Sequence, residues 1–156
     1  MKPRINALTA APGAVQTMLA LEQYIAGSGL ETRLVHLLKL RVSQINGCAY
    51  CIDMHYKDLR AAGETEQRLY MLDAWREYPG YSDRERAALA WAEAVTRIRD
   101  GQVADEAFAG VRAHFSDSEI ANLTLVVTTI NAWNRLNIAF RMPGGSYKPA
   151  AATVGA

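Results

Sequence analysis

Two cysteines and one histidine stand at helical spacing in the segment NGCAYCIDMH, residues 46–55. Steps of three and then four residues place Cys48, Cys51 and His55 on one face of a helix. Sulfurs one turn apart can reach disulfide geometry, and an imidazole that titrates near neutrality can take a proton from a thiol or return one to a leaving group. The spacing therefore indicates thiol redox chemistry.

The Asn-Gly pair at 46–47 strengthens this interpretation. Such a pair ends one helix and places Cys48 near the N-terminus of the next. There the unpaired amide groups and the helix dipole favour a thiolate over a thiol. We therefore expect a reactive pair of cysteines and not an inert one.

Three other interpretations of this segment remain open. Both cysteines could be small buried hydrophobic residues, with the histidine in a structural role. Two thiolates and one imidazole are three of the four usual zinc ligands, but the sequence has no second CxxC or HxxxH element to complete the site. A thioredoxin-type CxxC would follow a strand in a βαβ unit, and no strand pattern precedes this one. We expect no bound metal and no cofactor.

The composition limits the class of protein. A chain of 156 residues suits one domain, and 50% hydrophobic with 21% charged residues is a globular composition. Seventeen basic against sixteen acidic residues give a net charge of +1, which argues against a nucleic-acid partner. Two cysteines are too few for a disulfide-stapled secreted scaffold. The uncharged run at residues 120–134 is too short and too polar to span a bilayer, and the N-terminus has no continuous apolar signal segment. We expect a cytoplasmic protein that does not associate with membranes.

The chain reads as helices separated by short breaks. Apolar periodicity, turn residues and two capping boxes predict seven helices, at 12–27, 31–45, 48–62, 65–75, 82–98, 105–114 and 116–140. The second of these is apolar around much of its circumference, so we expect it between neighbours. No segment alternates with a period of two residues. The prediction is an all-α, compact helical bundle in one domain over residues 1–156, with an ordered core at about 12–141 and a loosely ordered tail at 142–156.

The run LKLRVSQINGCAYCIDMH at 38–55 resembles the core motif of the AhpD-like alkylhydroperoxidases, within the carboxymuconolactone decarboxylase superfamily. The resemblance extends to residues 81–91 and 131–135 and covers most of the chain from about 30 to 141. It implies an AhpD-like helical fold and a homo-oligomer, commonly a trimer or a hexamer.

The resemblance also implies a mechanism. Cys51 attacks a peroxide and becomes a sulfenic acid, and Cys48 resolves it as a disulfide, which agrees with the ready condensation of sulfenic acids with thiols. His55 occupies the position of a histidine in the proton relay of the family. The family usually has a glutamate twelve residues before the first cysteine, whereas this chain has His36, which either substitutes as a proton carrier or has no role. If the relay needs a carboxylate, Glu93 is the candidate, with an exposed structural position as the alternative.

The resulting hypothesis is a thiol-dependent peroxidase that reduces an organic hydroperoxide or hydrogen peroxide through a dithiol and disulfide cycle, with Cys51, Cys48, His55, His36 and Glu93 as site residues. A lipoyl-bearing or other dithiol protein is the expected reductant. Carboxymuconolactone decarboxylase-type activity on a small cyclic acid and a non-enzymatic redox sensor are the alternatives.

Overall fold

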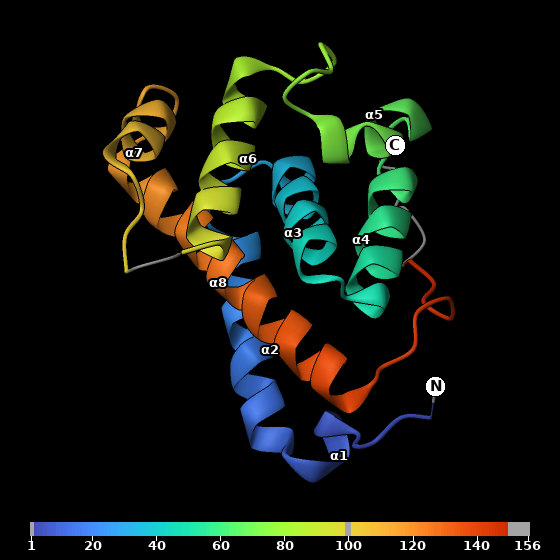
Figure 1. Cartoon of the computed structure of the whole chain (residues 1–156). Coiled ribbons are helices and arrows are strands. Elements are labelled where there is room, and N and C mark those ends of the chain that lie inside the picture. The colour runs from blue at the N-terminus through green and yellow to red at the C-terminus, as the bar shows by residue number, and fades with distance from the viewer. Residues whose placement is uncertain (1, 99–100, 150–156) are drawn as a thin grey trace, which may run out of the picture.

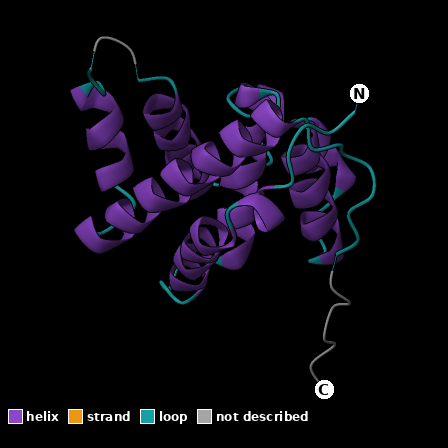
Figure 2. Ribbon diagram, turned by 90° about the horizontal axis from the view of Figure 1, so that it is seen from below, coloured by secondary structure: helices purple, strands orange, loops and turns teal. Residues whose placement is uncertain are grey.

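The computed structural model describes residues 2–98 and 101–149, and in this part of the chain all regular secondary structure is helical (Figures 1 and 2). The elements are α1 (Ala7–Ala10), α2 (Pro12–Ala26), α3 (Thr32–Asn46), α4 (Ala49–Ala61), α5 (Glu66–Tyr70), the 3₁₀ helix η1 (Leu72–Ala74), α6 (Asp83–Thr96), α7 (Asp105–Arg112) and α8 (Asp117–Phe140). The all-α prediction is confirmed.

Helix α3 is the centre of the packing. It lies against α4, α6 and α8, and Figure 1 shows it between α4 and α6 with α8 crossing at the side. Its leucines at 37, 38 and 40 and Val42 are almost wholly buried. The expectation that this apolar helix lies between neighbours is confirmed, and its burial fixes the direction in which the chain enters the Asn-Gly turn.

Two helix starts are held by capping boxes, as the sequence predicts. Ser82 accepts a hydrogen bond from the Glu85 amide while the Glu85 carboxylate accepts one from the Ser82 amide, and Ser116 and Glu119 repeat this arrangement at α8. Each box satisfies two amide donors that have no partner within the helix. The starts of α6 and α8 are therefore set locally.

The structure differs from the predicted helices in three places. A short helix, α1, precedes Pro12, and the predicted helix at 65–75 is divided into α5 and η1. Residues 142–149 lie against α4, because Lys57 donates to the carbonyl groups of Gly145 and Tyr147 and the Gly145 amide donates to Asp53. Gly145 and Tyr147 therefore make tertiary hydrogen bonds that a sequence without periodicity does not reveal.

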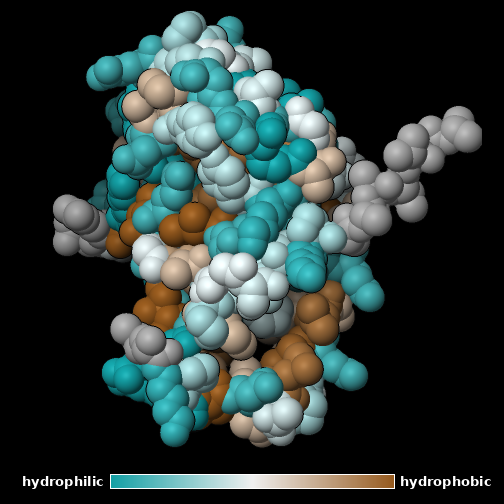
Figure 3. All heavy atoms as spheres, turned by 90° about the vertical axis from the view of Figure 1, so that its right-hand side faces the viewer, coloured by the Kyte–Doolittle hydropathy of each residue, from teal (hydrophilic) through white to brown (hydrophobic). Residues whose placement is uncertain are grey.

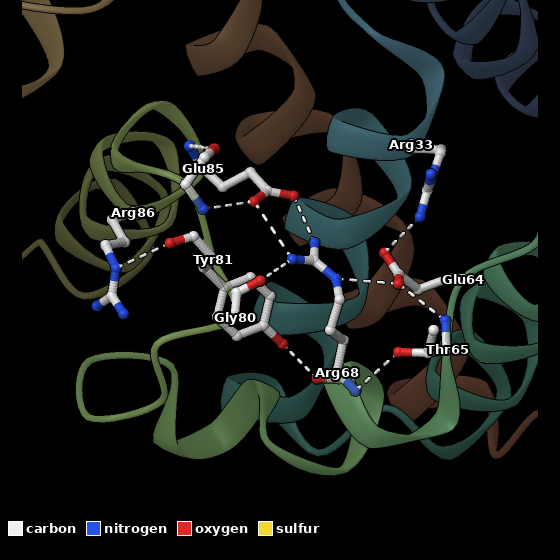
Figure 4. A network of polar contacts seen from close by, with 9 residues as sticks. Arg33, Glu64, Thr65, Arg68, Gly80, Tyr81, Glu85 and Arg86 are labelled. Atoms are coloured by element: carbon white, nitrogen blue, oxygen red, sulfur yellow. Dashed lines mark hydrogen bonds and ion pairs between the residues drawn. The ribbon is translucent and has the colours of Figure 1, made fainter.

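A polar cluster fixes the link from α4 to α5 and α6 (Figure 4). The Glu64 carboxylate is buried and accepts hydrogen bonds from the Thr65 amide and from the guanidinium of Arg68, while Arg33 pairs with its other oxygen. Arg68 also pairs with Glu85 at the start of α6. Because these side chains satisfy one another, the charge of Glu64 can be buried.

Among the described residues, the longest helices lack the sustained hydrophobic stretch that a membrane-spanning helix needs.

Candidate functional site

The turn between α3 and α4 places the two cysteines. Gly47 adopts a left-handed conformation, with φ of 72°, that ends α3, and the amide of Cys48 then donates to the carbonyl of Ser43 over 3.0 Å. Cys48 is the N-cap of α4, and Cys51 follows in its first turn. Any residue with a side chain would be strained in this left-handed backbone conformation. The turn between α3 and α4 therefore favours glycine at position 47.

The two thiols, three residues apart at the start of α4, shift each other's acidity in opposite directions. Both cysteines are 1% exposed and neither is in a disulfide. The hydrogen bond from Cys48 and further bonds from two asparagines outweigh burial and lower the pKa of Cys51 to about 7. The same interaction between the two thiols, together with burial, raises the pKa of Cys48 far above its ordinary value. Cys51 is therefore the more acidic thiol of the pair.

Helix α8 supplies the amide groups around Cys51. The side-chain amide of Asn137 donates to the Cys51 sulfur over 3.3 Å. Asn134 is fully buried and donates to the hydroxyl of Ser43, while its oxygen accepts from Asn46. Since an amide N–H stabilises a negative sulfur, α8 contributes to the reactivity of a residue in α4.

Cys51 opens onto a cavity of about 390 Å³ between the N-terminal helices, α3, α4 and the end of α8. Its lining is mostly apolar, with Val15, Leu19, Met54, Trp133 and Met142 among the residues. Figure 3 shows hydrophobic side chains at the surface of one face, both at mid-height and in its lower part. The cavity is suited to an organic molecule whose reactive group meets Cys51.

Two histidines line the same cavity and contact each other. The Nδ1 atoms of His36 and His55 are 3.2 Å apart, so one ring donates and the other accepts. His55 is buried, and burial and its neighbours lower its pKa well below the ordinary value; burial also lowers the pKa of His36. His36 thus lies beside His55 of the motif, and the Nε2 atom of the buried His55 ring is without a hydrogen-bond partner among the described residues.

A charged pair completes the wall of the cavity. Lys39 is nearly buried and pairs with Glu22 of α2, whose other oxygen accepts a hydrogen bond of 3.0 Å from the indole of Trp133. Because Lys39 and Trp133 each contact one oxygen of the Glu22 carboxylate, the charge of Lys39 is compensated within a largely apolar wall.

Glu93 lies elsewhere. Its carboxylate accepts hydrogen bonds from Arg41, Trp75 and Arg76, at 2.7, 3.0 and 2.8 Å, and is 3.4 Å from a nitrogen of Arg97. It is buried, so the exposed position considered for it is wrong. The structure brings Cys48, Cys51, His55 and His36 together and places Glu93 in an ion-pair cluster between α3 and α6.

Two polar residues near the site are absent from the sequence-based prediction. Asp58 lines the cavity, and its Oδ2 is 3.9 Å from Nδ1 of His36. Its position three residues after His55 on one helix face is a signal that could have found it. Asn137 is far away along the chain, and sequence spacing gives no sign of its contact with Cys51.

Comparison with known proteins gives a consistent picture. The model of the carboxymuconolactone decarboxylase family matches residues 12–94. The uncharacterized protein YdfG of Bacillus subtilis is 43% identical over 139 residues, which are 89% of this chain and 95% of YdfG.

Solved structures show the same fold. The protein of unknown function ATU0492 from Agrobacterium tumefaciens, proposed to be the antioxidant defence protein AhpD, superposes with a TM-score of 0.89 at 47% identity, over 94% of this chain and all of that one. A peroxidase-related protein with an AhpD core from Ralstonia eutropha has a TM-score of 0.79 at 20% identity, over 90% of this chain and 75% of that one.

Proposed function

Because the chain belongs to the carboxymuconolactone decarboxylase family and has an AhpD-like fold, we propose that it is a thiol peroxidase in which Cys51 reduces a hydroperoxide. One observation carries the proposal: Cys51, with its pKa lowered to about 7, opens onto an apolar cavity and lies one helical turn from a second thiol. A thiolate at neutral pH is the nucleophile that this reaction needs.

The first step is attack of the Cys51 thiolate on the terminal peroxide oxygen. The O–O bond breaks, the sulfur takes the hydroxyl group as a sulfenic acid, and the alkoxide leaves as an alcohol after it takes a proton. The imidazole pair of His36 and His55 lies in the same cavity, so it can carry the proton from the thiol to the leaving oxygen. The carboxylate of Asp58 lies beside the pair and stabilises it while it is protonated.

The second step is condensation. The Cys48 thiol attacks the sulfenic acid, a disulfide forms and water leaves. A dithiol then reduces the disulfide by thiol exchange, and we propose a lipoyl-bearing or similar dithiol protein as the reductant and a homo-oligomer as the active assembly. The raised pKa of Cys48 suits this order, because that thiol stays protonated until the sulfenic acid has formed.

The test is reaction of the reduced protein with cumene hydroperoxide, followed by mass spectrometry of the cysteines. We expect a Cys48–Cys51 disulfide in the wild type and a trapped sulfenic acid at Cys51 in Cys48→Ser. Cys51→Ser should consume no peroxide. Survival of both wild-type thiols, beside a thiol peroxidase control that is oxidised, would overturn the proposal.

The family also gives a second candidate, decarboxylase-type chemistry on a small cyclic acid, with the imidazole pair as the proton carrier. Turnover of such an acid by Cys51→Ser would support this candidate. A redox sensor would instead change its assembly between the reduced and the oxidised protein, which light scattering detects.

A further inference from the structure

Three potential ligand atoms converge on one side of the cavity. The Nδ1 atoms of His36 and His55 are 3.2 Å apart, and Oδ2 of Asp58 is 3.9 Å from the first of them. One ligand atom from each of the three residues lies within 4.8 Å of the other two. They come from two helices, with His36 on α3 and the other two residues one turn apart on α4.

The hydrogen bond between the two imidazoles does not account for the position of the carboxylate. Nδ1 of His36 faces both the ring of His55 and the carboxylate of Asp58. At 3.9 Å, Asp58 is beyond hydrogen-bond distance from that nitrogen. Atoms that converge on a common point are typical of ligands around a cation.

The distances suit zinc. With bonds of about 2.0–2.2 Å to nitrogen and oxygen, tetrahedral ligands stand roughly 3.3 Å apart. The two nitrogens are already near this separation, whereas the Asp58 oxygen, 3.9 Å from Nδ1 of His36, would have to move closer on binding. Two imidazoles and one carboxylate favour zinc or a similar transition metal over magnesium or calcium, which prefer oxygen ligands.

Neighbouring side chains orient the Asp58 carboxylate and compensate the nearby positive charge. The hydroxyl of Tyr147 donates to Oδ1 of Asp58 over 2.8 Å, which leaves Oδ2 free toward the histidines. Lys39, which also lines the cavity, is paired with Glu22.

We propose that His36, His55 and Asp58 form a binding site for a zinc-type divalent cation, with the remaining coordination positions open to the cavity. A metal on Nδ1 of His55 fixes the proton on Nε2, so this ring can no longer accept one from a thiol. Zinc should therefore inhibit peroxide reduction reversibly, and a chelator should restore it. This effect on activity rests on the proposed peroxidase function.

The binding test uses untagged protein in the Cys48→Ser/Cys51→Ser background, so that thiolates cannot bind the metal. Zinc is titrated by calorimetry, and cobalt by its visible absorption. We expect one ion per chain, with binding lost in His36→Ala and in Asp58→Asn. Tyr147→Phe should weaken binding about tenfold or more, because it removes the hydrogen bond that orients Asp58.

His114→Ala is the matched control, because His114 is exposed at a distance from the cavity. Circular dichroism verifies that each variant is folded. Equal cobalt binding by His36→Ala and its parent, or no binding by the parent, overturns the site. Since the background contains no cysteine, this result is independent of whether the protein reduces peroxides.

Discussion

The side-chain amide of Asn137, near the end of α8, donates a hydrogen bond to the sulfur of Cys51, in the first turn of α4, over 3.3 Å. The two residues are 86 positions apart in the chain. This contact makes the acidity of the cysteine depend on the packing of α8 against α4. The nucleophile is therefore tuned by tertiary structure as well as by its own helix.

Replacement of Asn137 by alanine should raise the pKa of Cys51 from about 7 toward its ordinary value, because the thiolate loses a donor. A rise of one pKa unit lowers the thiolate population at pH 7, and hence the rate of alkylation by iodoacetamide, by about fivefold. Asn131→Ala is the matched control, because Asn131 contacts Asn46 and Thr96. Equal effects of the two variants would show that Asn137 does not act on the sulfur.

The Cys48 thiol is the strongest influence that lowers the pKa of Cys51. Cys48→Ala removes this donor, whereas Cys48→Ser keeps a hydroxyl in its place. In a pH series of Cys51 alkylation, the midpoint should lie higher for Cys48→Ala than for Cys48→Ser. The wild-type rate should rise with pH, with a midpoint at about 7, because only the deprotonated sulfur reacts. The same midpoint in both variants would contradict the proposed hydrogen bond.

His55→Ala should slow oxidation of the thiols by cumene hydroperoxide about a hundredfold, the usual contribution of a placed proton carrier. The iodoacetamide rate, which needs no proton for a leaving oxygen, should change far less. A comparison of the two rates in one protein therefore separates proton transfer from a general disturbance of the site. Parallel loss of both rates would remove His55 from the relay.

His36→Glu should be tolerated. The ring of His36 is partly exposed at the cavity, and glutamate is the residue that the family usually has at this position. We expect a folded protein that keeps most of its peroxide reduction, whereas His36→Ala should be slower. Thermal unfolding and peroxide consumption measure the two effects, and an unfolded His36→Glu protein would show that the ring is packed for another purpose.

The helices could be predicted from the sequence because their signals are local. Apolar periodicity at α3, the Asn-Gly turn and the capping box at Ser82 each fix a boundary through neighbouring residues. Residues 65–75 divide into α5 and η1, and α5 is held by contacts from Arg68 to Glu64, which also pairs with Arg33 of α3. Local patterns cannot reveal this kind of constraint.

The candidate site likewise contains residues that local spacing predicts and residues that only tertiary packing brings together. Cys48, Cys51 and His55 share one face of α4, so their spacing is enough to join them. The helix terminus suggests a thiolate at Cys48, yet the lowered pKa is at Cys51, because a thiol and side-chain amides donate to that sulfur. Asn137 belongs to a distant helix, and only the packing of α8 brings it there.

Glu93→Gln tests whether the buried carboxylate serves stability and not thiol oxidation. Burial raises the pKa of Glu93, but hydrogen bonds from Trp75 and Arg76 and the ion pair with Arg41 outweigh it and lower the pKa to about 2. Removing one member of a buried charged cluster costs about 3 kcal/mol, so we expect a matching loss of unfolding free energy in urea.

The pH dependence of this effect has a definite sign. A carboxyl whose pKa is lower in the folded protein stabilises it fully above the unfolded value of about 4.5, and this contribution is lost as the pH falls toward about 2. The difference in stability between wild type and Glu93→Gln should therefore be large at pH 7 and shrink in that acidic range. At pH 7 the folded variant should oxidise its thiols at the wild-type rate. Slow oxidation by a variant that is still folded would indicate that Glu93 takes part in the proton relay.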